Sequence, residues 1–389
     1  MKICLLSDKY PPERGGLAVS AQRLARGLHG AGHHVTVCVM SAKLPPGQTK
    51  RVNYDGVTVY RVGKHDRDDD TLSAWFDAIC ALHRRLGGFD IIHAYYAVNA
   101  GFVGVYAGRY LHTPTIVSVR GNDLERGVFY PAKTGGVLWA LANADAVTTV
   151  TRDLSRKAAA LAPGQCIETI FNSVDTETFK PGRVDPRITA DLNADGIPLI
   201  GFVGEARAKK GFAPLLAAFA RVAERRPGAR LLLVGGMRPD CEPILSAFRT
   251  RYPEVEVWDV LHLPHEDLPY IYNLLDVLVI PSLHDGMPNA LLEGMASGCA
   301  VVASDAGGIP DVMRHERTGI LVAPGAIEEL AAAILDLLDH PERRRKLGGA
   351  ARAHMLAHFA PSREIDANVA LYNRLTGRSN RDEDDKRRA

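Results

Sequence analysis

The chain has 389 residues, which is too long for one ordinary core and about right for two, since domains usually run to roughly 100–200 residues. Hydrophobic residues make up 46% and charged residues 24%, a mixture typical of folded globular proteins that excludes wholesale disorder. Lysine and arginine number 47 against 45 aspartates and glutamates, so the net charge of +2 gives no global attraction to nucleic acid.

Six cysteines lie far apart without a Cys-x-x-Cys pair. This spacing favours reduced, mostly buried thiols over a disulfide framework or a zinc site. The first apolar run, Ile3 to Leu6, is too short for a signal peptide, and no later run approaches the ~20 residues of a membrane span. We therefore expect a cytoplasmic protein.

Short apolar, β-branched runs alternate with helical patterns in the first half of the chain. Apolar residues at helical spacing separate most of these runs, for example from Leu17 to Leu28 and from Leu72 to Leu86. Buried strands separated by helices predict a parallel sheet covered on both faces. The predicted strands are Ile3–Leu6, Val35–Met40, Val57–Val62, Ile91–Ala94, Thr115–Val119, Ala146–Val150 and Ile167–Ile170.

The same alternation restarts in the second half, after a stretch with Pro, Asp and Gly that ends at Pro198. Two successive doubly wound α/β domains with a cleft between them are the simplest interpretation. The second set of predicted strands is Leu199–Val203, Arg230–Val234, Val255–Val260, Val277–Ile280, Ala300–Ala303 and Ile320–Val322.

These patterns divide the chain into five parts. The tail is almost entirely charged or small residues, which predicts disorder. The expected parts are an N-terminal domain over 1–180, a linker over 181–198, a C-terminal domain over 199–355, a last helix over 356–376 and the tail over 377–389.

Ligands of open parallel sheets bind at the carboxyl ends of strands, so the loops there are the first candidates for a site. The first such loop runs from Lys9 to the pair Gly15-Gly16, which allows backbone amides to approach a charged ligand ahead of a helix. A phosphate or sugar contact and a plain turn are both compatible with it. No GxGxxG or GxxxxGK[ST] motif follows any predicted strand, which argues against nicotinamide dehydrogenases and P-loop enzymes.

The second loop, from Gly204 to Gly211, follows the first strand of the second domain. It places Arg207, Lys209 and Lys210 just ahead of a helix expected to begin near Phe212. Fixed cations beside helical amides suit a diphosphate. A solvated basic turn is the alternative interpretation.

The third loop follows the predicted strand Val277–Ile280 and leads into a helix expected to begin near Asn289. Asp285 lies in the loop and Glu293 in the first turns of the helix. An anion there would meet the amides of Asn289 to Leu291, while the carboxylates accept hydrogen bonds from sugar hydroxyls. Their ordinary alternatives are a turn former and a helix-dipole partner.

The three loops together resemble those of the family 4 retaining glycosyltransferases of the GT-B fold, over roughly residues 1–376. Asp285-x7-Glu293 with Gly286-Met287-Pro288 is similar to the E-x7-E signature, and Gly204 through Gly211 is similar to the G-R-L-x-x-x-K-G loop. The run from Phe171 to Asp175 with Phe179 matches an N-G-V-D-x-x-x-F segment, and Gly15-Gly16 matches the amino-terminal glycine loop.

This resemblance implies two Rossmann-like domains facing across a cleft, with the C-terminal helix crossing back to the first. It implies a glycosyltransferase of the EC 2.4 class that moves a sugar from a nucleotide-diphosphate sugar to a glycan, lipid-linked or small-molecule acceptor, with retention and without a metal or other cofactor. In the family, Glu293 binds the ribose hydroxyls. The implied donor-binding residues are Gly15, Gly16, Gly204, Arg207, Lys210, Asp285, Gly286, Met287, Pro288, Asn289, Ala290, Leu291 and Glu293.

Three positions depart from the family pattern. Asp285 is one methylene shorter than the usual glutamate, and Glu205 replaces a loop arginine whose role Arg207 could take. Arg120 stands where many relatives have a histidine, and it either contacts a phosphate or an anionic acceptor or pairs with Asp123. We assign Arg207, Lys210, Asp285 and Arg120 to catalysis.

Further candidates on the acceptor side are His93, Asn122 and Asp123. His93 ends a predicted strand, so a satisfied core histidine is as good an interpretation as a substrate contact. Trp75 and Phe76 open an amphipathic segment with Arg84-Arg85 that suits either core packing or contact with an anionic membrane surface.

Two other functions remain open at this point. A nucleotide-sugar 2-epimerase shares the same architecture, although the Asp285–Glu293 spacing and the Lys210 loop favour a transferase. A nucleotide-sugar-binding protein without activity would explain the departures at Asp285, Glu205 and Arg120.

Overall fold

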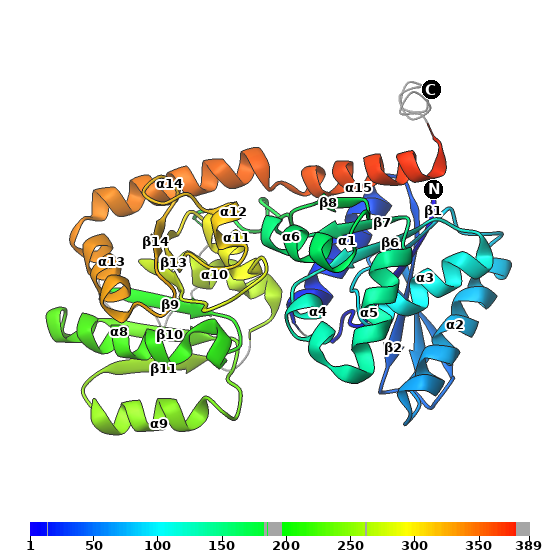
Figure 1. The fold of residues 1–389 in the computed structure, drawn as a ribbon. Helices are drawn as coiled ribbons and strands as arrows, with labels where there is room; N and C mark the ends of the chain where they lie inside the picture. The colour runs from blue at the N-terminus through cyan, green and yellow to red at the C-terminus, as the bar shows by residue number, and fades with distance from the viewer. Residues whose placement is uncertain (14, 183–184, 186–196, 261–262, 379–389) are drawn as a thin grey trace. The chain divides into compact units, whose positions relative to one another are not determined.

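The computed structural model describes residues 1–13, 15–182, 185, 197–260 and 263–378. Contacts divide the chain into two compact units, one made of Met1–Asn172 with the chain from Ser362, the other of Ser173–Pro361. Each unit is built on one sheet with helices packed against it (Figure 1). Most of the expected linker (183–184 and 186–196) and of the expected disordered tail (379–389) lies outside the described residues.

The sheet of the first unit has the order β3-β4-β2-β1-β5-β6-β7-β8, and every described pairing is parallel except that of β3 with β4. The order reverses between β1 and β5, which makes their carboxyl ends the switch point of this sheet. Its strands are β1 Lys2–Ser7, β2 His34–Ser41, β3 Thr49–Tyr54, β4 Val57–Gly63, β5 Ile91–Ala94, β6 Thr115–Val119, β7 Ala146–Thr149 and β8 Ile167–Thr169.

The edge strand β3 is the one strand of this sheet that the sequence pattern did not predict. Its residues are exposed or half-buried, and lysine, arginine and asparagine interrupt its apolar positions. A strand that buries neither face leaves no apolar run to recognise.

The helices of the first unit include α15, which comes from the far end of the chain. Its Ile365, Leu371 and Tyr372 are buried in the same core as Leu24 and Leu28 of α1. The helices are α1 Gly16–Gly30, α2 Asp68–Arg85, α3 Asn99–Leu111, α4 Asn122–Glu125, η1 Gly127–Phe129, α5 Pro131–Asn143, α6 Arg152–Leu161 and α15 Pro361–Thr376.

The sheet of the second unit is parallel throughout its described pairings and has the order β11-β10-β9-β12-β13-β14. Its order reverses between β9 and β12, so the switch point lies between these two strands. The strands are β9 Leu199–Val203, β10 Arg230–Val234, β11 Glu256–Val260, β12 Val277–Ile280, β13 Ala300–Ser304 and β14 Ile320–Val322.

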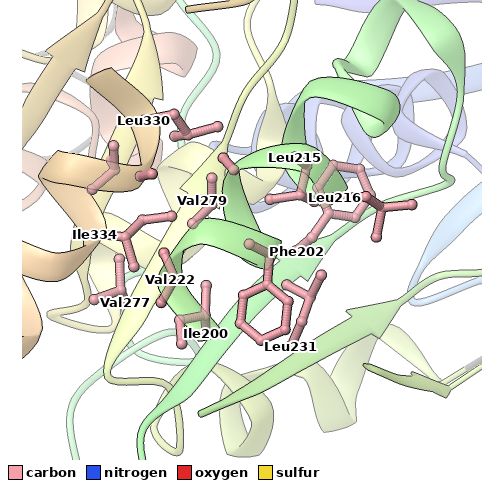
Figure 2. Packing of buried hydrophobic residues seen from close by; sticks show 14 of the residues in the cluster. Ile200, Phe202, Leu215, Leu216, Val222, Leu231, Val277, Val279, Leu330 and Ile334 are labelled. Carbon is pink, nitrogen blue, oxygen red and sulfur yellow. The ribbon is translucent and has the colours of Figure 1, made fainter. Parts of the chain in front are cut away.

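Apolar residues at helical spacing bury one face of α8 against this sheet. Figure 2 shows Leu215 and Val222 of α8 beside Ile200, Val279 and Ile334 in one cluster. Burying such a side chain stabilises the fold by roughly 1.5–3 kcal/mol.

The second unit also contributes helices of very different lengths. None of the helices in the described residues of either unit combines the length and the apolar character needed to cross a membrane. Those of the second unit are η2 Ala208–Lys210, α8 Phe212–Arg225, α9 Glu242–Arg251, η3 His265–Asp267, α10 Leu268–Tyr272, α11 Asn289–Ala296, α12 Ile309–Val312, α13 Ile327–Asp339 and α14 Pro341–His358.

The boundary between the units differs from the predicted end of the first domain at residue 180. Phe179 is 2% exposed, and its backbone carbonyl accepts a hydrogen bond of 2.7 Å from Arg352 of α14. The segment from Ser173 therefore packs as part of the second unit, although its composition changes only at Pro181. The predicted helix over 356–376 is the end of α14 followed by a separate helix, α15.

Candidate functional site

The loops after β9 and β12 meet at the switch point of the second sheet. The backbone amide of Leu283 donates to the carbonyl of Lys209 at 2.9 Å. Gly211 lies so close to the other loop that a Cβ atom there would stand 1.9 Å from the carbonyl oxygen of Pro281. Only glycine fits this approach, which brings the basic loop beside the loop that carries Asp285.

Lys210 and Asp285 form an ion pair where these loops meet, between Nζ and Oδ2. Burial alone would raise the pKa of Asp285, but the ammonium group of Lys210, together with Lys209 and the amide of Gly286, holds this pKa below its usual value. The amide of Gly308, in the loop after β13, donates to the carbonyl of Asp285 at 3.1 Å. Lys210 thus holds the carboxylate of Asp285, and the loop after β13 holds its backbone.

Arg207 lies in the same basic loop and forms an ion pair with Glu205. Its Nε is buried and has no hydrogen-bond acceptor among the described residues. A buried donor without a partner is costly in a folded protein and is usually explained by a ligand or a water molecule. The loop begins at Gly204, whose φ of 132° lies in the region that favours glycine.

The helix α11 begins at Asn289, as the sequence predicts, with Pro288 as its N-cap residue. Gly286 and Met287 are buried residues of the loop itself, and the side chain of Leu291 is fully buried. These residues can therefore present backbone groups but no side chain to a ligand. Asn289 and Ala290 are half-buried at the first turn of the helix.

Glu293 lies one turn further along α11 and is 6% exposed. Its Oε2 accepts a hydrogen bond of 2.8 Å from the hydroxyl of Tyr272, and its Oε1 lies 2.9 Å from Nε2 of His265. Asp285 and Glu293 therefore have different partners, an ammonium group for Asp285 and a tyrosine hydroxyl with a histidine ring for Glu293.

The first unit has a corresponding loop at its own switch point. Gly15 is the N-cap residue of α1 with a φ of 117°, and a Cβ atom there would meet nothing within 4 Å. Gly16 is the first residue of the helix. At the end of β1, Asp8 accepts a hydrogen bond of 3.1 Å from the amide of Ala100 in α3, and burial raises its pKa to about 6.

Arg120 follows β6 at the same edge of the first sheet. Its guanidinium group lies 4.1 Å from the ring centroid of Tyr95 and donates a hydrogen bond to Oδ1 of Asn172. No carboxylate of the described residues lies within ion-pair distance of it. The alternative in which this guanidinium pairs with Asp123 is wrong.

Asp123 has a structural role instead of the predicted acceptor contact. It is fully buried, and its carboxylate accepts hydrogen bonds from the backbone amides of Arg120 at 2.8 Å and Gly121 at 2.7 Å. The carboxylate therefore shapes the turn after β6. Asn122 begins the short helix α4 that follows this turn.

His93 is a core histidine, which is one of the two interpretations that the sequence left open. It is fully buried, and its ring nitrogens lie 2.6 Å from the hydroxyl of Tyr372 and 2.6 Å from the hydroxyl of Ser118. Burial lowers its pKa to about 3, so the ring is neutral. The alternation of a strand does not show which face will be covered, and here α15 covers it.

Two other sequence alternatives concern side chains away from the loops. Trp75 is 1% exposed, so it belongs to the core and cannot contact a membrane surface. All six cysteines are free thiols, five of them buried and Cys166 exposed. Among the residues described, no group of three or more His, Cys, Asp or Glu side chains could hold a metal ion.

Sequence reasoning missed three aromatic or histidine side chains that hold site residues in place. His265 and Tyr272 bind Glu293 from 28 and 21 residues away, and Tyr95 stacks on Arg120. His265 lies in η3 and Tyr272 in α10, and neither belongs to one of the three loops that the sequence singled out. No local motif marks them.

Two family models match the chain, one in each half. The model described as Glycosyltransferase Family 4 matches residues 14–178, and the one described as Glycosyl transferases group 1 matches residues 197–340. The alpha-maltose-1-phosphate synthase of Mycolicibacterium smegmatis is 27% identical over 97% of this chain and 100% of that protein. A GDP-mannose-dependent alpha-mannosyltransferase of Mycobacterium tuberculosis is 25% identical over 97% and 98%.

Solved structures with the same arrangement of elements show the fold. Sucrose-phosphate synthase from Thermosynechococcus elongatus matches with a TM-score of 0.82 and 24% identity over 97% of this chain and 100% of that chain. HepE from Anabaena in complex with UDP-glucose matches with a TM-score of 0.78 and 18% identity over 95% and 99%.

Proposed function

Since the chain belongs to the family 4 glycosyltransferases and has their GT-B fold, we propose that it transfers a sugar from a nucleotide-diphosphate sugar to an acceptor hydroxyl, with retention of the donor's anomeric configuration. That it is a glycosyltransferase follows from the family. The donor, the acceptor and retention are parts of the proposal. HepE, of the same fold, binds UDP-glucose.

The observation that carries the donor side is the cation cluster at the switch point of the second sheet. Lys210 keeps N–H donors beyond the one directed at Asp285, because an ammonium group has three. The buried Nε of Arg207 has no acceptor among the described residues. A diphosphate at this edge would accept hydrogen bonds from both side chains and from the amides at the start of α11.

In the proposed step, the bond between the anomeric carbon and the diphosphate oxygen breaks while the acceptor oxygen bonds to that carbon on the same face. The acceptor proton passes to an oxygen of the leaving diphosphate, so a nucleoside diphosphate is released. Arg207 and Lys210 stabilise the negative charge that grows on the diphosphate. Asp285 holds the sugar, and the open space beside Gly15 leaves the start of α1 accessible to a ligand.

On the acceptor side we assign Arg120 to an anionic group of the acceptor. Its planar guanidinium group is held by Tyr95 and Asn172 and forms no ion pair with a described carboxylate. Arginine recognises phosphate and carboxylate groups through such a preorganised plane. Asn122, half-buried two residues on, is the second candidate contact.

No metal takes part in the proposed step, because Arg207 and Lys210 supply the positive charge. Initial rates of transfer should be the same with and without EDTA. Loss of activity in EDTA that returns with Mg²⁺ or Mn²⁺ would assign the charge stabilisation to a metal ion instead.

The products formed from a panel of nucleotide sugars test the reaction class. We expect mass spectrometry to find a sugar attached to an acceptor, or released by slow hydrolysis of the donor. An isomerised donor without transfer, which has the same mass as the donor and is recognised by proton NMR, would identify an epimerase, an alternative that none of the relatives named above supports. Binding of the donor without any turnover would identify an inactive binding protein.

We further propose that the first unit contacts an anionic membrane surface through an aromatic cluster on α2, α3 and α5. Tyr106 and Tyr110 are 53% and 63% exposed and lie 5.3 and 5.5 Å from Phe76, between ring centroids. Arg109 lies over Trp139, and neither α3 nor α5 contains an acidic residue. Tyrosine and tryptophan beside cations are typical of membrane interfaces.

Sedimentation with vesicles tests this contact. We expect the protein to bind phosphatidylglycerol vesicles and not phosphatidylcholine vesicles, and Tyr106→Ser with Tyr110→Ser to abolish the binding. If the double variant sediments with these vesicles as well as the wild type does, the proposal is wrong. If the wild type does not bind vesicles but forms dimers in a concentration-dependent way, the aromatic cluster is a protein interface.

A further inference from the structure

Glu293 is a nearly buried carboxylate whose ion-pair partner among the described residues is a histidine, His265. Its side chain is 8% exposed, and among the described residues no lysine or arginine forms an ion pair with it. Burying a carboxylate is costly unless hydrogen bonds replace the lost water. Its two partners, Tyr272 and His265, therefore carry most of this compensation.

These two partners take one oxygen each. The hydroxyl of Tyr272 donates to Oε2 at 2.8 Å, and Nε2 of His265 lies 2.9 Å from Oε1. Burial, followed by the charge of Glu293, raises the pKa of Tyr272 well above its usual value, so the hydroxyl stays protonated and donates. A carboxylate with both oxygens bound in this way cannot rotate about its last bond without losing a hydrogen bond.

The partners are themselves fixed by one aromatic side chain. Phe179 packs edge-on against both rings, with centroids 5.3 Å from His265 and 5.9 Å from Tyr272. Arg352 of α14 donates to the carbonyl of Phe179 at 2.7 Å and to that of Ala296, the last residue of α11, at 2.9 Å. One arginine thus ties the backbone of Phe179 to the helix that carries Glu293.

We infer that His265 and Tyr272 are positioning residues that set the plane of the Glu293 carboxylate for two adjacent hydroxyl groups of the donor's ribose. A carboxylate has about four lone-pair sites, so two remain after these partners are bound. Fixing the plane also fixes the directions of the remaining sites. The inference rests on the proposed role of Glu293 and names the residues that make this role selective.

The test compares the affinity of a nucleoside diphosphate with that of its 2′-deoxy form by calorimetry, using whichever of UDP, GDP and ADP binds tightest. Tyr272→Phe and His265→Ala should each weaken binding of the ribo form about fivefold, and should weaken binding of the 2′-deoxy form less, because that form keeps only one of the two hydroxyls. His265→Gln, which keeps an N–H donor, should restore part of the difference. Tyr252→Phe, in the same unit and away from Glu293, is the matched control.

A merely structural role would give a different pattern. If either variant weakens both forms equally, or if both variants keep the discrimination of the wild type, the positioning role is wrong. If the wild type binds the two forms equally well, the assignment of Glu293 itself fails, and Glu293→Gln would then also have no effect on the ratio. His265 has a side chain 42% exposed, so its variants should fold even if Tyr272→Phe does not.

Discussion

Nζ of Lys210 contacts Oδ2 of Asp285 across 75 residues of sequence, where the loops after two adjacent parallel strands meet. The pair is mostly covered, with side chains 23% and 13% exposed. It therefore does two things at once. It joins the two loops, and it keeps an ammonium group at the edge where the proposed diphosphate binds.

Lys210→Ala should weaken binding of a nucleoside diphosphate roughly tenfold or more, because one charge-assisted hydrogen bond is worth about 1.5–3 kcal/mol. Calorimetry measures the affinity directly. Arg225→Ala, which removes an exposed cation at the end of α8, is the matched control and should leave the affinity unchanged. Equal affinities of Lys210→Ala and the wild type would remove Lys210 from the donor site.

Asp285→Asn should destabilise the second unit by about 1.5–3 kcal/mol at pH 7, since Lys210 is left without its partner. The pKa of Asp285 is lowered in the folded protein, so its contribution is full above its ordinary value near 4 and is lost as the pH falls below that. Urea unfolding from pH 7 to pH 3 should show the difference between variant and wild type shrinking. Asp339→Asn, which breaks an exposed ion pair with Arg226, is the control and should change the free energy of unfolding only slightly. If the difference in stability between Asp285→Asn and the wild type stays the same at pH 3, the role assigned to Asp285 is contradicted.

Arg120→Ala should raise the KM for the acceptor and leave the affinity for the nucleoside diphosphate unchanged. Arg120 belongs to the first unit, whereas the loops of the proposed donor site belong to the second. Arg120→Lys keeps the charge but not the plane, so it should recover only part of the activity. Steady-state kinetics with sugar phosphates and their unphosphorylated parents separates the two effects. Equal use of both acceptor types by the wild type would show that no anionic group is recognised.

The free energy of unfolding of the first unit should fall as the pH rises from about 4 to 6, because the buried carboxyl group of Asp8 loses its proton over this range. Burial raises its pKa from 3.8 to about 6, so the folded state holds the proton more tightly than the unfolded state over this range. Asp8→Asn should therefore be more stable than the wild type above pH 6, with an advantage that disappears near pH 4. Thermal unfolding across this range, with the exposed Asp366→Asn as control, would show no such trend if Asp8 were fully solvated.

The sequence predicted the buried strands because each of them is a short run of apolar residues. Val277–Ile280 is four consecutive apolar residues, all buried, and the strand has these bounds. Thr49–Tyr54 buries neither face and was missed. The change of composition at Pro181 predicts that the first domain ends at residue 180, whereas the chain from Ser173 already packs with the second unit.

The candidate site divides in the same way between local and long-range information. The sequence predicted that Lys210 and Asp285 each lie in a loop after a strand, but not that the two strands are neighbours or that the side chains pair. His93 and Asp123 have the residue types of a site and are held entirely by buried contacts. Only the packing of α15 and of the turn after β6 decides this, and neither is visible in the sequence around these residues.

The last prediction concerns the stereochemistry of the reaction. Asp285 is held by Lys210 through Oδ2, and Glu293 by Tyr272 and His265, so neither carboxylate stands as a free nucleophile beside a second acid, as in retaining glycosidases. A same-face reaction needs no such nucleophile, because the leaving diphosphate accepts the acceptor's proton. Proton NMR of the product should therefore show the donor's anomeric configuration, and mass spectrometry during turnover should find no sugar attached to Asp285. An inverted product would refute retention, and a trapped adduct on Asp285 would replace the same-face step by double displacement.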